Sequence, residues 1–295
     1  MTNTATVGWR GGSAAPIVLS FDVDAESAIL AAGVEYASHA MAMTHQAFGP
    51  RVGVPRLLGL LAEYGLPATF FVPGLTADRY PEVVEAILIA GHEVGHHSYS
   101  HVSGIDLGPD GERRDFERAL EALDRRGVRP RGHRAALWEA TWQTPGLVAE
   151  YGLLYDSSLM DADYPYELEV GNGQTRSLVE IPIQWALDDW EQFCFLPEVS
   201  GSGLIETPAK ARELWQAEFE GLRSVGGCWV LTNHPFLSGR PSRAHELDQL
   251  MAHVVSCSDD WVASLEDIAR HVRGLGLDRR TVELPTGLED STEAP

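Results

Sequence analysis

The chain has 295 residues, of which 44% are hydrophobic and 22% are charged, which is ordinary for a soluble globular protein. This length accommodates one large domain or two small ones. A formal net charge of -21 argues against nucleic acid or an anionic membrane as the main partner. The three cysteines show no C-x-x-C spacing, which argues against a disulfide framework and suits a reducing compartment.

Strand-like and helix-like segments alternate along the chain. Compact apolar runs predict buried strands at 17–21, 68–72 and 228–232, and the segments before Arg134 and Asp189 are also interpreted as strands. Helical patterns with proline starts or glycine stops cover 55–64, 112–126, the stretch from Pro81 to Gly91, and segments opening at 144, 207 and 264. Six to eight such units favour a parallel sheet, flat or closed into a barrel.

The two ends of the chain differ from this pattern. Residues 1–15 lack the apolar segment of an export signal, and no later apolar run is long enough to cross a bilayer, so we expect a cytoplasmic protein. Residues 276–295 are polar and aperiodic, which predicts a flexible tail or an arm that packs on another subunit of a homo-oligomer. Residues 16–275 then form one catalytic domain.

The segment GHEVGHHSYSH, from Gly91 to His101, contains two overlapping metal motifs. H-E-x-x-H, the zinc-protease signature, would need His92 and His96 on one continuous helix that runs through two glycines, each costing roughly 1 kcal/mol relative to alanine. The third ligand and the glycine turn expected downstream in such proteases are absent. The zinc-protease interpretation is therefore rejected.

H-x-x-x-H, formed by His97 and His101, is the alternative. On a straight strand these residues would be about 13 Å apart, too far to share one ion. We therefore predict a strand through about His96 and then a turn, such as one helical turn, that brings the two imidazoles together. Backbone N–H groups of that turn are candidates for an oxyanion site.

Further polar residues follow other predicted strands. Asp22 and Asp24 come directly after the first strand and point the same way, while Arg134, Asp189 and His234 follow later ones. Both α/β barrels and open α/β sheets build their sites at the carboxyl ends of strands. We therefore expect these side chains to converge.

Over roughly residues 16–275 the chain resembles the polysaccharide deacetylases of the NodB-homology type, carbohydrate esterase family four, and a subgroup whose first motif reads FDVD. SFDVD resembles the first family motif, which implies that Asp22 is the catalytic base and Asp24 a metal ligand. GHEVGHHSYSH resembles the second, which implies that His97 and His101 are the other ligands. The resemblance implies a single-domain distorted (β/α) barrel.

RGHRAALW, LDDW and LTNHP resemble the remaining three motifs. They imply that Arg134 braces the base and that Asp189 pairs with a catalytic acid, His234. Ala136 stands where the family usually has proline, and His96 stands where a residue other than histidine is usual; we interpret His96 as a bystander. Trp138, Trp185 and Trp190 lie near these motifs and are candidates for the walls of a substrate pocket.

Two imidazoles and one carboxylate suit Zn²⁺, and also Co²⁺, Ni²⁺ or Fe²⁺, and leave positions open for water and substrate. The implied reaction is metal-dependent hydrolysis of a C–N amide other than a peptide, such as the N-acetyl group of a sugar or a related small amide. Alternatives are an allantoinase-like hydrolase of cyclic ureides, a non-haem Fe(II) oxygenase with the same ligand types, and an inactive binding protein.

Overall fold

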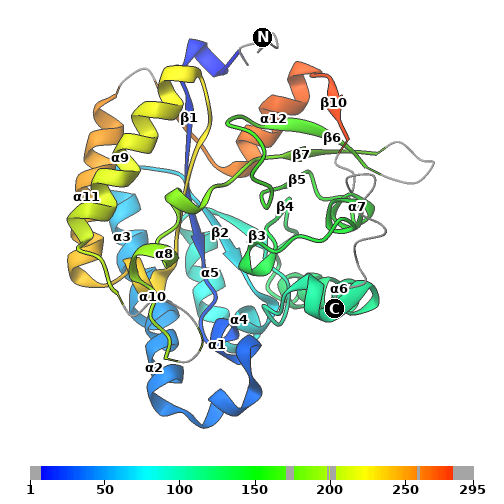
Figure 1. Cartoon of the computed structure of the whole chain (residues 1–295), viewed down its shortest axis with the longest axis vertical. Helices are drawn as coiled ribbons and strands as arrows, with labels where there is room; N and C mark the ends of the chain where they lie inside the picture. Colours follow the sequence, from blue (N-terminus) through cyan, green and yellow to red (C-terminus); the bar gives the residue numbers. More distant parts are fainter. Residues whose placement is uncertain (1–7, 171–175, 198, 200–203, 258–259, 282–295) are drawn as a thin grey trace, which may run out of the picture.

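The chain folds as one mostly parallel sheet with helices packed around it, as a computed structural model shows for residues 8–170, 176–197, 199, 204–257 and 260–281 (Figure 1). Within these residues the strands are β1 (Pro16–Asp22), β2 (Thr69–Val72), β3 (Glu93–His96), β4 (Gly132–His133), β5 (Tyr155–Asp156), β6 (Tyr166–Val170), β7 (Arg176–Glu180), β8 (Trp229–Asn233), β9 (Trp261–Val262) and β10 (Arg279–Arg280).

The helices in the same described ranges are α1 (Ser27–Ala32), α2 (Ala40–Phe48), α3 (Val54–Tyr64), α4 (Gly74–Arg79), α5 (Pro81–Ile89), α6 (Gly104–Asp124), α7 (Thr144–Glu150), α8 (Trp190–Phe193), α9 (Pro208–Val225), α10 (Pro235–Ser238), α11 (Pro241–Ser256) and α12 (Leu265–Leu275). Among them there is no helix that combines the length and the apolar character needed to cross a membrane.

The sheet closes on itself through one weak seam. Its strands are ordered β10-β6-β7-β5-β4-β3-β2-β1-β8, with β9 paired to the start of β1, and every pair is parallel except β6 with β7. The chain leaving β7 returns to the opposite end of this order, where Asp188 makes a single parallel bridge to Thr232 of β8. The predicted α/β fold and its parallel sheet are confirmed, and this bridge gives the sheet its distorted barrel form.

Side chains of β1 alternate between two environments because successive residues of a strand point to opposite faces. Leu19 and Phe21 join the main hydrophobic cluster with residues of α3, α5, α9 and α11. Ser20 and Asp22 point to the other face, inside the barrel, where both accept hydrogen bonds from Arg134. The same alternation therefore buries the helix-facing side of the strand and delivers polar groups to the interior.

Two strand glycines make room for aromatic rings inside the barrel. A Cβ atom on Gly95 would lie 2.5 Å from the ring of Phe71, and one on Gly132 would lie 1.8 Å from the ring of Tyr155. Both rings are fully buried. The middle of the barrel is thus filled by side chains, and the open cavity lies beyond it, at the carboxyl ends of the strands.

Several helices begin or end where the local sequence predicts. Gly65, with φ of 63°, ends α3, and Ser264 caps α12 by accepting a hydrogen bond from the N–H of Asp267. Helix α6 begins earlier than the predicted residue 112, because a first turn joins it across Gly108, whose φ is 65°. The strand predicted in the segment before Asp189 ends early, at Glu180, since Pro182 cannot donate a hydrogen bond to a neighbouring strand.

The ordered structure extends beyond both predicted domain boundaries. Trp9, within the expected flexible segment 1–15, is 6% exposed and donates its Nε1–H to the carbonyl of Gly226 at 2.8 Å. Arg279 and Arg280, within the expected tail 276–295, pair with β6. Residues 282–295, where most of the predicted tail or arm falls, lie outside the described residues.

Candidate active site

Polar side chains from several strands meet around a cavity of about 170 Å³. Its lining consists of Asp22, Asp24, His97, His101, Leu137, Trp138, Trp185, Asp188, Trp190, Glu191 and His234. Most of the residues predicted from the sequence are in this set. Arg134 and Asp189 lie directly behind it, each bonded to a lining residue.

The chain after β1 carries two acids into the cavity. Asp22 ends the strand, and Asp24, two residues on, points the same way. The carbonyl of Asp24 accepts hydrogen bonds from the N–H and hydroxyl of Ser27 and from the hydroxyl of Thr76, at 3.1, 2.6 and 2.7 Å. These bonds fix the backbone so that the Asp24 carboxylate faces the cavity.

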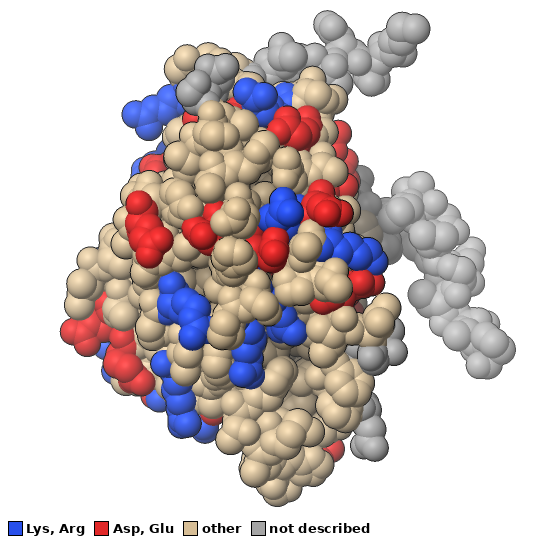
Figure 2. Space-filling view, turned by 90° about the vertical axis from the view of Figure 1, so that its left-hand side faces the viewer, with Lys and Arg blue, Asp and Glu red and all other residues tan. Residues whose placement is uncertain are grey.

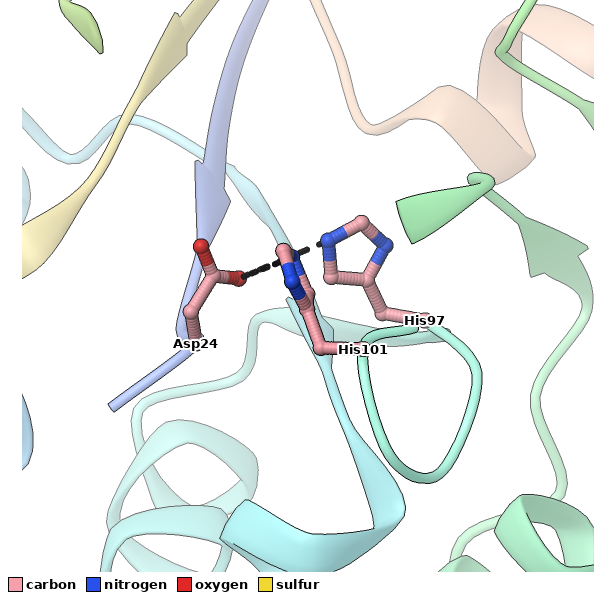
Figure 3. A group of neighbouring side chains, drawn as sticks. All are labelled: Asp24, His97 and His101. Carbon is pink, nitrogen blue, oxygen red and sulfur yellow. Dashed lines mark ion pairs between the residues drawn. The ribbon is translucent and has the colours of Figure 1, made fainter. Parts of the chain in front are cut away.

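Asp24, His97 and His101 form a buried group whose ligand atoms converge (Figure 3). The Nε2 atoms of the two histidines lie 3.4 and 3.3 Å from the same Asp24 oxygen. All three side chains are almost fully buried, and neither oxygen of Asp24 has a hydrogen-bond partner. A buried carboxylate without partners is costly unless something compensates its charge. The residues therefore fit a divalent cation, with two imidazoles and one carboxylate as donors.

The turn that joins the two histidines is irregular, not helical. Ser98 and His101 have φ of 58° and 63°, a left-handed backbone that few non-glycine residues adopt. The carboxylate of Asp115, from α6, accepts the N–H groups of Tyr99 and Ser100 at 2.7 and 3.1 Å and holds the turn. The predicted convergence is confirmed. Of the N–H groups expected to form an oxyanion site, those of Tyr99 and Ser100 are excluded, because both already bond Asp115.

The charged groups around Asp24, His97 and His101 favour the ionised form of Asp24. Burial alone would raise the pKa of Asp24, but His101, His97 and His234 outweigh it and hold that pKa well below its usual value. Burial alone would lower the pKa of His97, yet Asp22 and Asp24 raise it. The Nδ1 of His97 lies 2.8 Å from the carbonyl of Arg134 and donates to it, which directs Nε2 toward Asp24.

Asp22 is held from behind by a fully buried arginine. Arg134 donates from Nη1 to one Asp22 oxygen at 2.9 Å, and its other N–H groups bond Ser157. The guanidinium also lies over the ring of Phe71, at 4.3 Å. The second Asp22 oxygen is 3.9 Å from Nε2 of His97. Asp22 therefore stands beside the cluster with one oxygen anchored and the other facing the cavity.

His234, the first residue after β8, is held on the opposite side. Its Nδ1 lies 2.7 Å from Asp189 and 3.4 Å from Asp188, and its Nε2 is 3.5 Å from the second oxygen of Asp24. Asp189 also accepts the N–H of His234 and the hydroxyl of Ser238. Burial would lower the pKa of His234, but the two aspartates raise it well above its usual value. The oxygens of Asp189 are already bonded. Asp188 and Asp189 therefore act as a clamp that holds the imidazole of His234 in place.

The three predicted tryptophans all line the cavity. Trp138 and Trp185 stack with ring centroids 4.7 Å apart, and Trp190 lies edge-on to His234 at 5.1 Å. Leu137 and Trp138 have φ of 57° and 58°, so the loop after the third motif takes a left-handed path. These backbone angles bring both side chains to the cavity even though alanine stands where the family usually has proline.

Sequence reasoning missed three lining residues, Leu137, Asp188 and Glu191. Two adjacent acids in LDDW were a signal for Asp188, whereas nothing local marked the other two.

The H-E-x-x-H residues point into three separate environments. His92 lies against Phe70 outside the cavity, and Glu93 accepts the hydroxyl of Tyr155 at the far end of the barrel. His96 is fully buried, with Nε2 3.1 Å from the carbonyl of Phe116. The rejection of the zinc-protease interpretation is therefore sound, and His96 has a structural role outside the cavity.

Comparison with known proteins agrees with this architecture. A family model described as polysaccharide deacetylase matches residues 34–153. The peptidoglycan deacetylase of Helicobacter pylori is 32% identical over 231 residues, spanning 70% of this chain and 79% of that protein. The crystal structure of a putative polysaccharide deacetylase from Mycobacterium smegmatis is 53% identical, with a TM-score of 0.93 over 97% of this chain and 99% of that one.

An allantoinase structure also superposes, with a TM-score of 0.80 over 92% of this chain and 95% of that one; at 24% identity this likeness shows the fold alone. The chain is thus a hydrolase of the class that acts on carbon–nitrogen bonds other than peptide bonds. It belongs to the polysaccharide deacetylase family, the carbohydrate esterases with a NodB-homology domain.

Proposed function

We propose that this protein is a metal-dependent deacetylase that removes the acetyl group from the nitrogen of an N-acetylated sugar or a related small amide. The observation that carries the proposal is the pair of unpartnered, buried oxygens of Asp24 facing two imidazoles. When bound, Zn²⁺ would polarise the acyl oxygen and make water a stronger nucleophile. Asp24, His97 and His101 are the residues that would hold it.

Proton transfer is assigned to two groups that flank this cluster. Asp22 takes a proton from the attacking water through the oxygen that Arg134 leaves unbonded. Arg134 orients Asp22, because its guanidinium is fixed by Ser157 and donates a hydrogen bond to one Asp22 oxygen. His234 carries a proton at Nε2, on the cavity side, while Asp189 holds Nδ1, and it donates that proton to the leaving nitrogen.

The size and lining of the cavity favour one small acylated unit. Its volume of about 170 Å³ is below the roughly 300–1,000 Å³ common for ligand sites. Trp138 and Trp185 provide a flat apolar surface against which one face of a ring can pack. A single N-acetylated ring, free or at the end of a chain, is the substrate that these features support.

Two substitutions in the first motif test the assignment. Asp24→Ala should abolish both metal content and activity, whereas Asp22→Asn should keep the metal and lose about 10²–10⁴-fold in rate, the usual contribution of a general base. Metal content is measured by plasma mass spectrometry and activity by acetate release from N-acetylglucosamine and its oligomers. A metal-loaded, fully active Asp24→Ala protein would refute the proposal.

Allantoin assayed in parallel tests the alternative substrate class. The complete Asp24, His97 and His101 set argues against a metal-free, allantoinase-like activity. Ring opening of allantoin that survives metal removal, without acetate release from any sugar, would favour that alternative.

A further inference from the structure

A second group of metal-ligating side chains lies on the outer helices, away from the cavity. It consists of Glu220 on α9 and of His253 and Cys257 at the end of α11, and one ligand atom from each lies within 4.8 Å of the others. His253 lies in the last turn of α11 and Cys257 directly follows the helix, where its Sγ comes within 4.8 Å of a ligand atom of His253. Glu220 faces them from the neighbouring helix, with an oxygen 3.0 Å from Nε2 of His253.

The side chains around this group hold it in place. The ring of His253 meets Phe219 edge-on at 5.7 Å, which orients the imidazole. One turn after Glu220, Arg223 donates from Nε to both oxygens of Asp260, at 3.2 and 3.0 Å. This ion pair ties the chain that follows Cys257 to α9. The two segments that carry the ligands are therefore fixed relative to each other without an ion.

The group is open to solvent, and the surface around it is not dominated by one charge. Glu220 is 48% exposed and His253 30%, while Cys257 is partly buried against the main hydrophobic cluster. Figure 2 shows the side of the molecule on which α9 and α11 lie, with acidic and basic side chains interspersed. An ion can therefore reach the ligands, and the ligand chemistry itself, not a general acidic field, would decide what binds.

The three donors differ in type, and together they favour zinc. A thiolate and an imidazole are soft or borderline ligands that disfavour Mg²⁺ and Ca²⁺, and a carboxylate completes a mixed S, N, O set that suits Zn²⁺. Zinc–ligand bonds of about 2.0–2.3 Å place ligand atoms roughly 3–4 Å apart in a tetrahedron. The present separations, all within 4.8 Å, are close to that arrangement. Binding would release the thiol proton of Cys257 to solvent, and water would fill the fourth position.

The group lies at the opposite end of the barrel from the cavity. Cys257 comes shortly before β9, whose Trp261 pairs with Pro16 at the start of β1, whereas Asp24 lies just past the end of β1. That strand has seven residues, which span about 20 Å. An ion held here cannot touch the substrate, and its effect would be to clip α9 to α11 (Figure 1).

We propose that Glu220, His253 and Cys257 form a second, structural zinc site that joins α9 and α11 and is independent of the site at Asp24. Cobalt distinguishes the two, because only this group offers sulfur: Asp24, His97 and His101 supply oxygen and nitrogen. Titration of the metal-free protein with Co²⁺ should give two bound equivalents and a sulfur-to-cobalt charge-transfer band in the near ultraviolet.

Matched variants assign that band. Cys257→Ser should lose the band and one equivalent, with a native circular dichroism spectrum, and Glu220→Gln should weaken the band-forming site at least tenfold. His97→Ala should keep the band while losing the other equivalent. In the His97→Ala background, Zn²⁺ should raise the melting temperature, and adding Cys257→Ser should abolish that rise. Absence of the band in the native chain, or its persistence in Cys257→Ser, would overturn the proposal.

Discussion

Glu93, the acid of the unused H-E-x-x-H motif, should contribute to the pH dependence of stability. Its carboxylate accepts the hydroxyls of Thr69 and Tyr155, at 2.7 Å each, and the N–H of Glu266 at 3.0 Å. Complete burial outweighs these bonds and raises its pKa from 4.5 to about 7. The folded chain thus keeps a proton that the unfolded chain releases between these two values.

The sign and size of the effect follow from that difference. Below pH 4.5 Glu93 is protonated in both the folded and the unfolded state, and its full contribution to stability is present. As the pH rises from 4.5 to about 7, the unfolded state releases the proton first, so the free energy of unfolding falls. A shift of this size corresponds to about 3 kcal/mol at most. Glu93→Gln stays neutral in both states, so it should gain up to about 3 kcal/mol relative to the native chain between pH 5 and pH 8.

Urea unfolding at pH 5 and at pH 8, after removal of metal by a chelator, measures the difference in stability between Glu93→Gln and the native chain. The reloaded variant should bind the same amount of metal as the native chain and keep its activity. If this difference in stability is the same at both pH values, the explanation that burial raises the pKa of Glu93 is refuted. Loss of metal in Glu93→Gln would instead revive the H-E-x-x-H site.

Three other changes test how the active site is held. Arg134→Met leaves Asp22 buried without its partner and should cost about 3–5 kcal/mol in urea unfolding, where a loss below 1 kcal/mol would contradict the buried pair. Asp189→Asn removes a carboxylate that raises the pKa of His234, so the alkaline limb of the pH–rate profile should move to lower pH; an unmoved limb would exclude His234 as the acid. Trp185→Ala should raise KM several-fold with kcat and metal content nearly unchanged, and an unchanged KM would show that this ring does not bind substrate.

Much of this arrangement could be predicted because it depends on local sequence. The apolar run before Asp22 fixes a strand, and period-two alternation then sends Asp22 and Asp24 to one face. The same rule directs His97 into the barrel after β3 and sets His96 against the helix layer. Geometry alone required the turn before His101, since an extended chain would have separated the two histidines.

What could not be predicted depends on contacts between distant parts of the chain. Asp115 holds the metal-binding turn from α6, yet in the sequence it is one of many charges on a solvated helix. The burial of Trp9 becomes visible only when the carbonyl of Gly226 is brought beside it. The path of the chain after β7 depends on Pro182. In the sequence the apolar residues around Pro182 indicated a continuous strand, so its strand-ending effect was not predicted.

The seam at Asp188 and Thr232 separates two parts of the active site that are held by different kinds of contact. Asp24, His97 and His101 belong to β1 and β3, which a continuous parallel ladder joins through β2. The clamp on His234 instead comes from the segment that closes the barrel by this bridge, by a hydrogen bond from the N–H of Asp189 to the carbonyl of Thr232, and by the bonds of the Asp189 carboxylate to His234 and Ser238. Because these contacts are confined to Asp188 and Asp189, whereas the ladder extends over three strands, the seam should open before the ladder does. Such an opening would release the imidazole from its aspartate while leaving the three ligands together, so the protein could lose proton transfer to the leaving group without losing its ion.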